Sequence, residues 1–223
     1  SLSADFFSDT LKLPTQRMAP VKWFANGWYQ DLRDLEEPLD KTMWKDAVQK
    51  LDPKREVTDD VWIFKAQWTD GFEAVGGGKL DKADLAYRKN GSGDDGGKQY
   101  RAASGEQTYD LKTNKKDADV AYDAFAGFVR TVNGVGLKDA NGLEIPANDP
   151  KRFNTDAYRK AMEQNADVYG MLRAYTGLVM TGSWDNLVNP SNFAWVGEKA
   201  KDGNVKFSAL PVDLDSTWGL RWD

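Results

Sequence analysis

The sequence predicts an α+β protein in which antiparallel hairpins and helices occupy separate stretches of the chain. Two observations indicate this class. Apolar residues recur at helical spacing over 117–133. Short apolar runs also flank turn sequences at Asn26-Gly27 and at 201–204. The chain has 223 residues, of which 40% are hydrophobic. It is therefore long enough to bury a substantial core and too apolar to remain disordered.

The first part of the chain is expected to contain one hairpin between two helices. The Asn26-Gly27 pair supplies the residues that a tight hairpin turn requires, because both adopt positive φ angles readily. Asp40 is a candidate N-cap, and Asp52-Pro53 would end the helix that it starts. The predicted elements are a short helix over 5–11, strands over 21–24 and 28–37, a helix over 41–50 and a strand over 61–65.

The later part is expected to contain three helices followed by a second hairpin. The helices are predicted over 117–133, 156–164 and 168–180, and the strands over 192–196 and 205–210. We expect the apolar stripe of the third helix to pack in the core; its members are Val168, Met171, Leu172, Tyr175 and Val179. The three helices should form one lobe, with residues 185–219 on its surface.

Composition excludes several classes of chemistry. The chain has no His and no Cys, which excludes a Ser-His-Asp triad, a cysteine protease, a thiolate zinc site and disulfides. Catalysis would have to use carboxylates, amides, hydroxyls, Lys or Arg, with a cation that prefers oxygen ligands. The net charge of −5 argues against a nucleic-acid partner. No apolar run is long enough for a transmembrane helix.

Polar residues around the second hairpin could form one site. Asp185 and Asn192 precede the hairpin, and Asp213 and Asp215 follow it. Because a hairpin returns to its starting point, its two ends lie close together. Carboxylate and amide oxygens suit Mg²⁺ or Mn²⁺, and a spare carboxylate could accept a proton. The alternatives are turn caps, the start of a calcium loop, and the metal-binding Asp-x-Asp of a glycosyltransferase.

The same segment resembles the spore coat CotH family of atypical kinases. The matching stretches are W-D-N-L-V-N-P-S-N-F-A-W-V from residue 184 and K-F-S-A-L-P-V-D-L-D-S-T-W-G from residue 206. Weaker matches are 24–29, 37–40 and 109–114. The resemblance implies a protein-kinase-like fold: residues 1–40 as the end of the N-lobe with the hinge hairpin, and 41–223 as a mainly helical C-lobe. The implied activity transfers the γ-phosphate of ATP to protein Ser/Thr hydroxyls with Mg²⁺ or Mn²⁺.

The resemblance also implies a role for each site residue. Asp185 matches the catalytic base, and Asn192 matches a metal ligand. Asp213 and Asp215 match the Asp-x-Asp of the family, with Asp213 favoured as the main ligand. Glu37 matches the hinge, where adenine would lie.

Three features depart from the family pattern. Ala194 replaces an aromatic residue, and Val212 replaces a Trp. The Gly-rich loop and phosphate-binding Lys expected upstream are not found, and no initiator Met precedes Ser1. We therefore expect a piece of a longer protein, whose activity in isolation is left open.

Two other functions are consistent with the sequence. One is a catalytically inactive kinase-like module that binds at a surface. The other is a carbohydrate-binding or carbohydrate-active domain, because nine Trp residues could include rings that stack on sugars. The expected partners are ATP and a protein with Ser/Thr acceptors, and an extracellular, cell-surface or spore-surface location is favoured.

Overall fold

The α+β class is confirmed by the computed structural model, which describes residues 2–66, 83, 85–89, 92–93, 96–101, 109–183, 193–212 and 214. The helices are α1 (Leu2–Asp5), α2 (Lys41–Leu51), α3 (Ala118–Val132), α4 (Asp156–Asn165) and α5 (Val168–Met180). A π-helical turn, η1 (Phe6–Thr10), and the 3₁₀ turns η3 (Gly97–Tyr100), η4 (Lys115–Asp117) and η5 (Pro150–Asn154) accompany them. The strands are β1 (Met18–Ala25), β2 (Trp28–Glu36), β3 (Val61–Ala66), β4 (Tyr109–Leu111), β5 (Phe193–Lys199) and β6 (Val205–Pro211).

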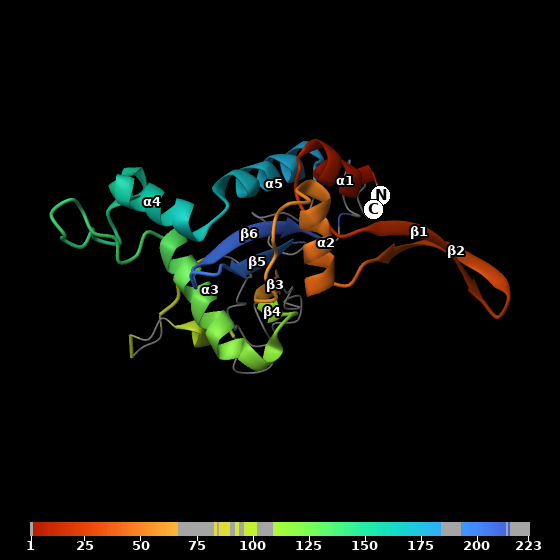
Figure 1. Cartoon of the computed structure of the whole chain (residues 1–223), viewed down its shortest axis with the longest axis horizontal. Helices are drawn as coiled ribbons and strands as arrows, with labels where there is room; N and C mark the ends of the chain where they lie inside the picture. The colour runs from red at the N-terminus through yellow and green to blue at the C-terminus, as the bar shows by residue number, and fades with distance from the viewer. Residues whose placement is uncertain are drawn as a thin grey trace, which may run out of the picture.

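A four-stranded antiparallel sheet, in the order β4-β3-β5-β6, forms the centre of the molecule (Figure 1). Its side chains alternate between two hydrophobic clusters, as the two-residue period of a strand requires. On β3, Trp62 and Phe64 belong to the cluster that contains α3, whereas Val61 and Ile63 belong to the cluster that contains α2. Both faces of the sheet are therefore buried under helices.

The β5–β6 hairpin was expected over nearly these residues, and its strands are confirmed. Its expected place on the surface of a helical lobe is wrong. β5 pairs with β3 on one side and with β6 on the other, and its first five residues are buried. The hairpin belongs to the core because both of its faces carry apolar side chains.

The β1–β2 hairpin forms a separate two-stranded sheet that projects from the rest of the described chain (Figure 1). The predicted Asn26-Gly27 turn is confirmed, with φ angles of 52° and 79°. No residue of β1 is buried. A β-bulge between Trp23 and Phe24 shifts the register near the tip.

Three of the four helices α2 to α5 begin with an N-cap residue whose side chain accepts a backbone hydrogen bond. The side chains of Asp40, Thr155 and Asp167 accept hydrogen bonds from backbone N–H groups at the starts of α2, α4 and α5. Asp117 precedes α3 but makes no capping bond with its side chain. Of the helices in the described ranges, none is long and apolar enough to cross a membrane.

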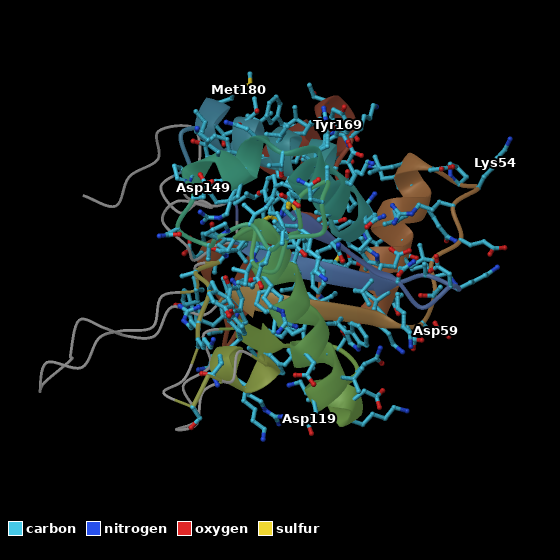
Figure 2. All side chains as sticks on the ribbon, turned by 90° about the vertical axis from the view of Figure 1, so that its left-hand side faces the viewer. Lys54, Asp59, Asp119, Asp149, Tyr169 and Met180 are labelled. Atoms are coloured by element: carbon cyan, nitrogen blue, oxygen red, sulfur yellow. The ribbon has the colours of Figure 1, made fainter. Side chains whose placement is uncertain are left out.

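The core face predicted for α5 is only partly confirmed, because Val168 and Met171 pack against the larger cluster whereas the other three members do not. Leu172, Tyr175 and Val179 are exposed, and Figure 2 shows Tyr169 and Met180 of the same helix at the edge of the molecule. The buried positions are instead Gly170, Ala174, Gly177 and Leu178. Small residues let the helix approach its neighbours closely, and this gain outweighed the larger side chains that the periodicity favoured.

Candidate functional site

Four of the predicted site residues, Asp185, Asn192, Asp213 and Asp215, lie outside the described residues. Glu37 is the one predicted site residue that the structure describes. Two parts of the candidate site can therefore be described. One is the pair of strand ends, on β5 and β6, that lie next to Asn192 and Asp213 in the sequence. The other is the surroundings of Glu37.

The strand ends next to the predicted metal ligands lie side by side. Phe193, at the start of β5, pairs in register with Pro211, at the end of β6. Beyond Pro211, Val212 is buried in the cluster beneath α2, and Leu214 is buried in the larger cluster of α3. Two apolar anchors thus hold the chain immediately before and after position 213.

The two positions at which the sequence differs from the CotH resemblance lie in one cluster. Ala194 and Val212 are both buried beneath α2, in the cluster that contains Met43 and Trp44. Trp44 is almost fully buried, and its indole N–H donates to a carboxylate oxygen of Glu198 at 3.0 Å. Ala194, Val212 and Trp44 therefore belong to one buried cluster.

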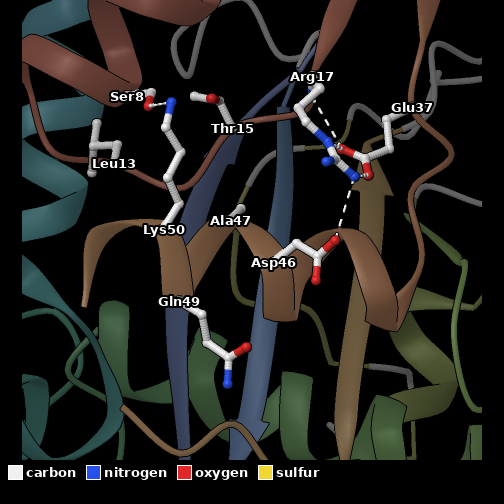
Figure 3. Close-up of a pocket in the computed structure, with 9 residues that line it drawn as sticks. All are labelled: Ser8, Leu13, Thr15, Arg17, Glu37, Asp46, Ala47, Gln49 and Lys50. Atoms are coloured by element: carbon white, nitrogen blue, oxygen red, sulfur yellow. Dashed lines mark hydrogen bonds and ion pairs between the residues drawn. The ribbon is translucent and has the colours of Figure 1, made fainter. Parts of the chain in front are cut away.

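Glu37 is held by Arg17 from the segment before β1 (Figure 3). The Arg17 guanidinium donates to both carboxylate oxygens of Glu37, and the Arg17 backbone N–H donates to Oε2 at 3.2 Å. These hydrogen bonds to Arg17 lower the pKa of Glu37 below its ordinary value. Arg17 also contacts Asp46 of α2 at 3.4 Å. We call Arg17, Glu37 and Asp46, together with Gln16, the stem clamp, because they join both ends of the hairpin to α2.

The backbone of Glu37 is also engaged. Its N–H donates to the Arg17 carbonyl at 3.0 Å, and its carbonyl accepts from the Gln16 amide at 2.6 Å. An adenine that hydrogen-bonded to these groups would have to displace Gln16 or share its acceptor. The structure thus gives Glu37 a role in fixing the hairpin stem, and any contact with a nucleotide would be additional to it.

A cavity of about 290 Å³ lies beside the stem clamp, at the lower end of the range for small-molecule sites (Figure 3). Its walls come from η1, the segment before β1, the residue after β2 and one side of α2. The lining residues are Ser8, Leu13, Thr15, Arg17, Glu37, Asp46, Ala47, Gln49 and Lys50.

Within the described ranges, no group of three or more Asp and Glu residues is arranged to hold a metal ion. Lys112, in the matched stretch 109–114, and Lys65, on the neighbouring strand β3, differ in their surroundings. Lys112 Nζ donates to the carboxylate of Asp110 at 2.5 Å, and Lys65 is half-buried on β3.

The sequence did not single out Gln16, Arg17 or Thr15. They precede a strand in a segment without regular structure, and nothing in their spacing distinguishes them from other polar residues. Their importance depends on the register of β1 and β2, which places Arg17 next to Glu37.

No family model matches the chain, and the curated proteins contain no significant match to it.

Proposed function

We propose that the chain carries the catalytic segment of a CotH-like kinase, which transfers the γ-phosphate of ATP to Ser/Thr hydroxyls of a protein. The main support is the agreement between the Asp-Asn-Asp motif and the hairpin that separates its members. Phe193 and Pro211 are cross-strand partners. The start of β5, which follows Asn192 in the sequence, therefore lies beside the end of β6, which precedes Asp213.

The proposed chemistry assigns one role to each side chain. Asn192, Asp213 and Asp215 would supply oxygen ligands for Mg²⁺ or Mn²⁺, whose charge would neutralise the phosphates. The substrate oxygen forms a bond to the γ-phosphorus, the bond to the β–γ bridging oxygen breaks, and ADP leaves. Asp185 would accept the hydroxyl proton. This reaction needs positioning and charge more than a strong nucleophile, so the absence of His and Cys does not oppose it.

The test compares Asp185→Asn with Asp213→Asn in the full-length protein. Asp185→Asn should reduce phosphate incorporation by about 10²–10⁴-fold, because it removes the base, while nucleotide affinity should stay near that of the wild type. Asp213→Asn should weaken nucleotide binding and raise the metal concentration required, because it removes a negative charge facing a divalent cation.

The readouts are phosphate incorporation from labelled ATP and nucleotide affinity by calorimetry, each with and without a chelator. Asp59→Asn, at an exposed position before β3 whose carboxylate makes no hydrogen bond to a described residue, is the matched control for the loss of one carboxylate. The proposal is wrong if neither site variant changes phosphate incorporation, or if chelation leaves nucleotide affinity unchanged.

A second candidate function rests on the hairpin tip. Trp23, Phe24, Trp28 and Tyr29 are exposed around the Asn26-Gly27 turn, with Trp28 at 77% exposure, whereas Trp44 and Trp62 are buried. Exposed aromatic rings can stack on sugars. A protein that bound a polysaccharide through Trp28 but transferred no phosphate would favour this function over the kinase.

A further inference from the structure

The end of the β1–β2 hairpin carries aromatic side chains on both of its faces. Phe24 and Tyr29 are cross-strand partners, and their rings meet edge to face with 5.7 Å between centroids. Trp28 pairs with Ala25, one residue closer to the turn, and therefore points to the opposite face. Trp23 directly precedes Phe24, so the same alternation places it on that second face. We call these four aromatic residues the aromatic tip.

The aromatic tip is exposed to solvent at the distal end of the hairpin. The exposed fractions of Trp23, Phe24, Trp28 and Tyr29 are 47%, 54%, 77% and 56%. Figure 1 shows the hairpin projecting away from the central sheet and its helices. The Trp28 indole N–H and the Tyr29 hydroxyl make no hydrogen bond to a described residue. A concentration of large exposed apolar side chains such as this one marks an interaction site.

The two-sided arrangement restricts what can cover the aromatic tip. A rigid, flat partner would contact the rings of one face and leave those of the other face in water. Covering both faces requires an environment that surrounds the tip, either a deep cleft in a protein or the interfacial layer of a lipid bilayer. The cavity beside the stem clamp has a volume of about 290 Å³, whereas one benzene-sized ring alone needs about 150 Å³. This cavity of a second copy is therefore too small for four rings.

The chemistry of the aromatic tip suits a bilayer interface. Trp and Tyr combine an apolar ring with a polar group, and both are enriched where acyl chains meet headgroups. Residues 23–30 carry no charged side chain, and the nearest charges are the exposed Lys22 and Asp31. The strand spans about 10 Å from Trp23 to the turn at Asn26, and the headgroup layer of one leaflet is about 5–8 Å thick. The rings can therefore enter this layer while both charges stay in water.

From these observations we propose that the aromatic tip inserts into the interfacial layer of a lipid bilayer and attaches the protein to a membrane surface. The tip stays out of the hydrocarbon core, because the edges of a two-stranded sheet carry unpaired backbone groups that need water or headgroups as partners. The preferred lipid is zwitterionic, as phosphatidylcholine is. Lys22 and Asp31 cancel at the tip, and the net charge of −5 on the whole chain is repelled by an anionic surface.

The test mixes the chain with phosphatidylcholine vesicles and measures the fraction that floats with them as the lipid concentration increases. Trp28→Gln and Tyr29→Gln should each weaken binding by about tenfold, the order expected when one large apolar side chain no longer leaves water. Tyr169→Gln on α5 removes an aromatic ring that is 80% exposed outside the hairpin, and it should leave binding unchanged. Trp28→Phe keeps a ring at the tip and should bind nearly as the wild type does.

The depth of the tip gives a second readout. Trp28→Phe removes one fluorophore, so the difference in emission between the wild type and this variant reports the surroundings of Trp28. Lipids brominated at different positions along the acyl chain should quench this difference signal most strongly when the bromine lies closest to the headgroup. Adding phosphatidylserine to the vesicles should weaken binding at low salt, because the chain is acidic.

The proposal is overturned if the wild type does not bind these vesicles, if Tyr169→Gln weakens binding as much as Tyr29→Gln, or if anionic lipid strengthens binding. Self-association or polysaccharide binding that depends on Trp28, without vesicle binding, would also overturn it and assign the tip to a second copy or to a sugar. If Tyr29→Gln loosens the hairpin through its lost contact with Phe24, Trp28→Gln decides. No readout depends on phosphoryl transfer, so failure here is distinguishable from failure of the proposed kinase.

Discussion

At the scale of single residues, Arg17 shows how one side chain can join three parts of a fold. It contacts Glu37 after β2 and Asp46 on α2 while lying just before β1. Two exposed charges alone contribute little to stability. Here the pair also includes backbone hydrogen bonds between Arg17 and Glu37 and a bond from Gln16. Several bonds converge on Glu37, so this carboxylate is the best point at which to test the clamp.

Glu37→Gln should lower the melting temperature by about 2–4 °C near neutral pH, the shift expected for a small loss in a chain of this size. The pKa of Glu37 is lowered in the folded state by Arg17. Its contribution is therefore present above the ordinary glutamate pKa and is lost as the pH falls through the lowered value. The difference between wild type and variant should accordingly shrink below about pH 4.5. Melting curves from pH 3 to 7 provide the check, with Glu163→Gln on the exposed face of α4 as control. A difference that does not depend on pH would contradict the ionic role.

At the scale of elements, the sequence predicts where a helix or turn begins better than it predicts which face of a helix is buried. The hairpin turn at Asn26-Gly27 and the cap at Asp40 are local, because a few neighbouring residues determine them. The buried face of α5 is not local. It depends on Phe7 and Leu11, which approach Gly177 from a segment more than 160 positions away. Periodicity alone placed Leu172, Tyr175 and Val179 wrongly, because it depends on side-chain size and contains no information about which residues approach one another closely.

Gly177 and Gly127 form a matched pair for testing this close approach. A Cβ at Gly177 would lie 2.4 Å from Leu11 Cδ1 and 2.6 Å from Phe7 Cε1, whereas a Cβ at Gly127 on α3 meets nothing within 4 Å. Gly177→Ala should destabilise the protein by about 1–3 kcal/mol through overpacking. Gly127→Ala should stabilise it by about 0.5–1 kcal/mol, because alanine is the better helix former. Urea denaturation measures both, and equal effects of the two substitutions would show that α5 does not pack closely against η1.

At the scale of the whole molecule, the sequence predicted the α+β class and most elements, but not the layered core. The expected architecture was a helical lobe with a hairpin on its surface. In the structure the sheet separates two clusters, and β5 is one of its inner strands. The continuous apolar runs of β3 and β5, typical of strands buried on both faces, carry this information. It could not be interpreted from the sequence because the β3–β5 pairing joins segments about 130 residues apart.

The division into a buried sheet and a projecting hairpin predicts unequal stability within one chain. β5 is buried on both faces, while β1 has no buried residue and pairs only with β2 among the described strands. A two-stranded hairpin is marginally stable unless other parts of the protein support it. Amides of β1 should therefore exchange with solvent through local opening, whereas those of β5 should exchange only through global unfolding.

Hydrogen exchange should accordingly show protection at least about 100-fold greater for Val196 on β5 than for Lys22 on β1, since opening free energies range from near zero to the global value. The stem clamp refines this expectation. Because Glu37 fixes the base of the hairpin, Glu37→Gln should accelerate exchange at β1 and β2 by more than it accelerates exchange at β5. Equal acceleration in all three strands would mean that the clamp stabilises the molecule as a whole. Equal protection of Val196 and Lys22 in the wild type would mean that the hairpin unfolds together with the central sheet, and the separation into two units would then be wrong.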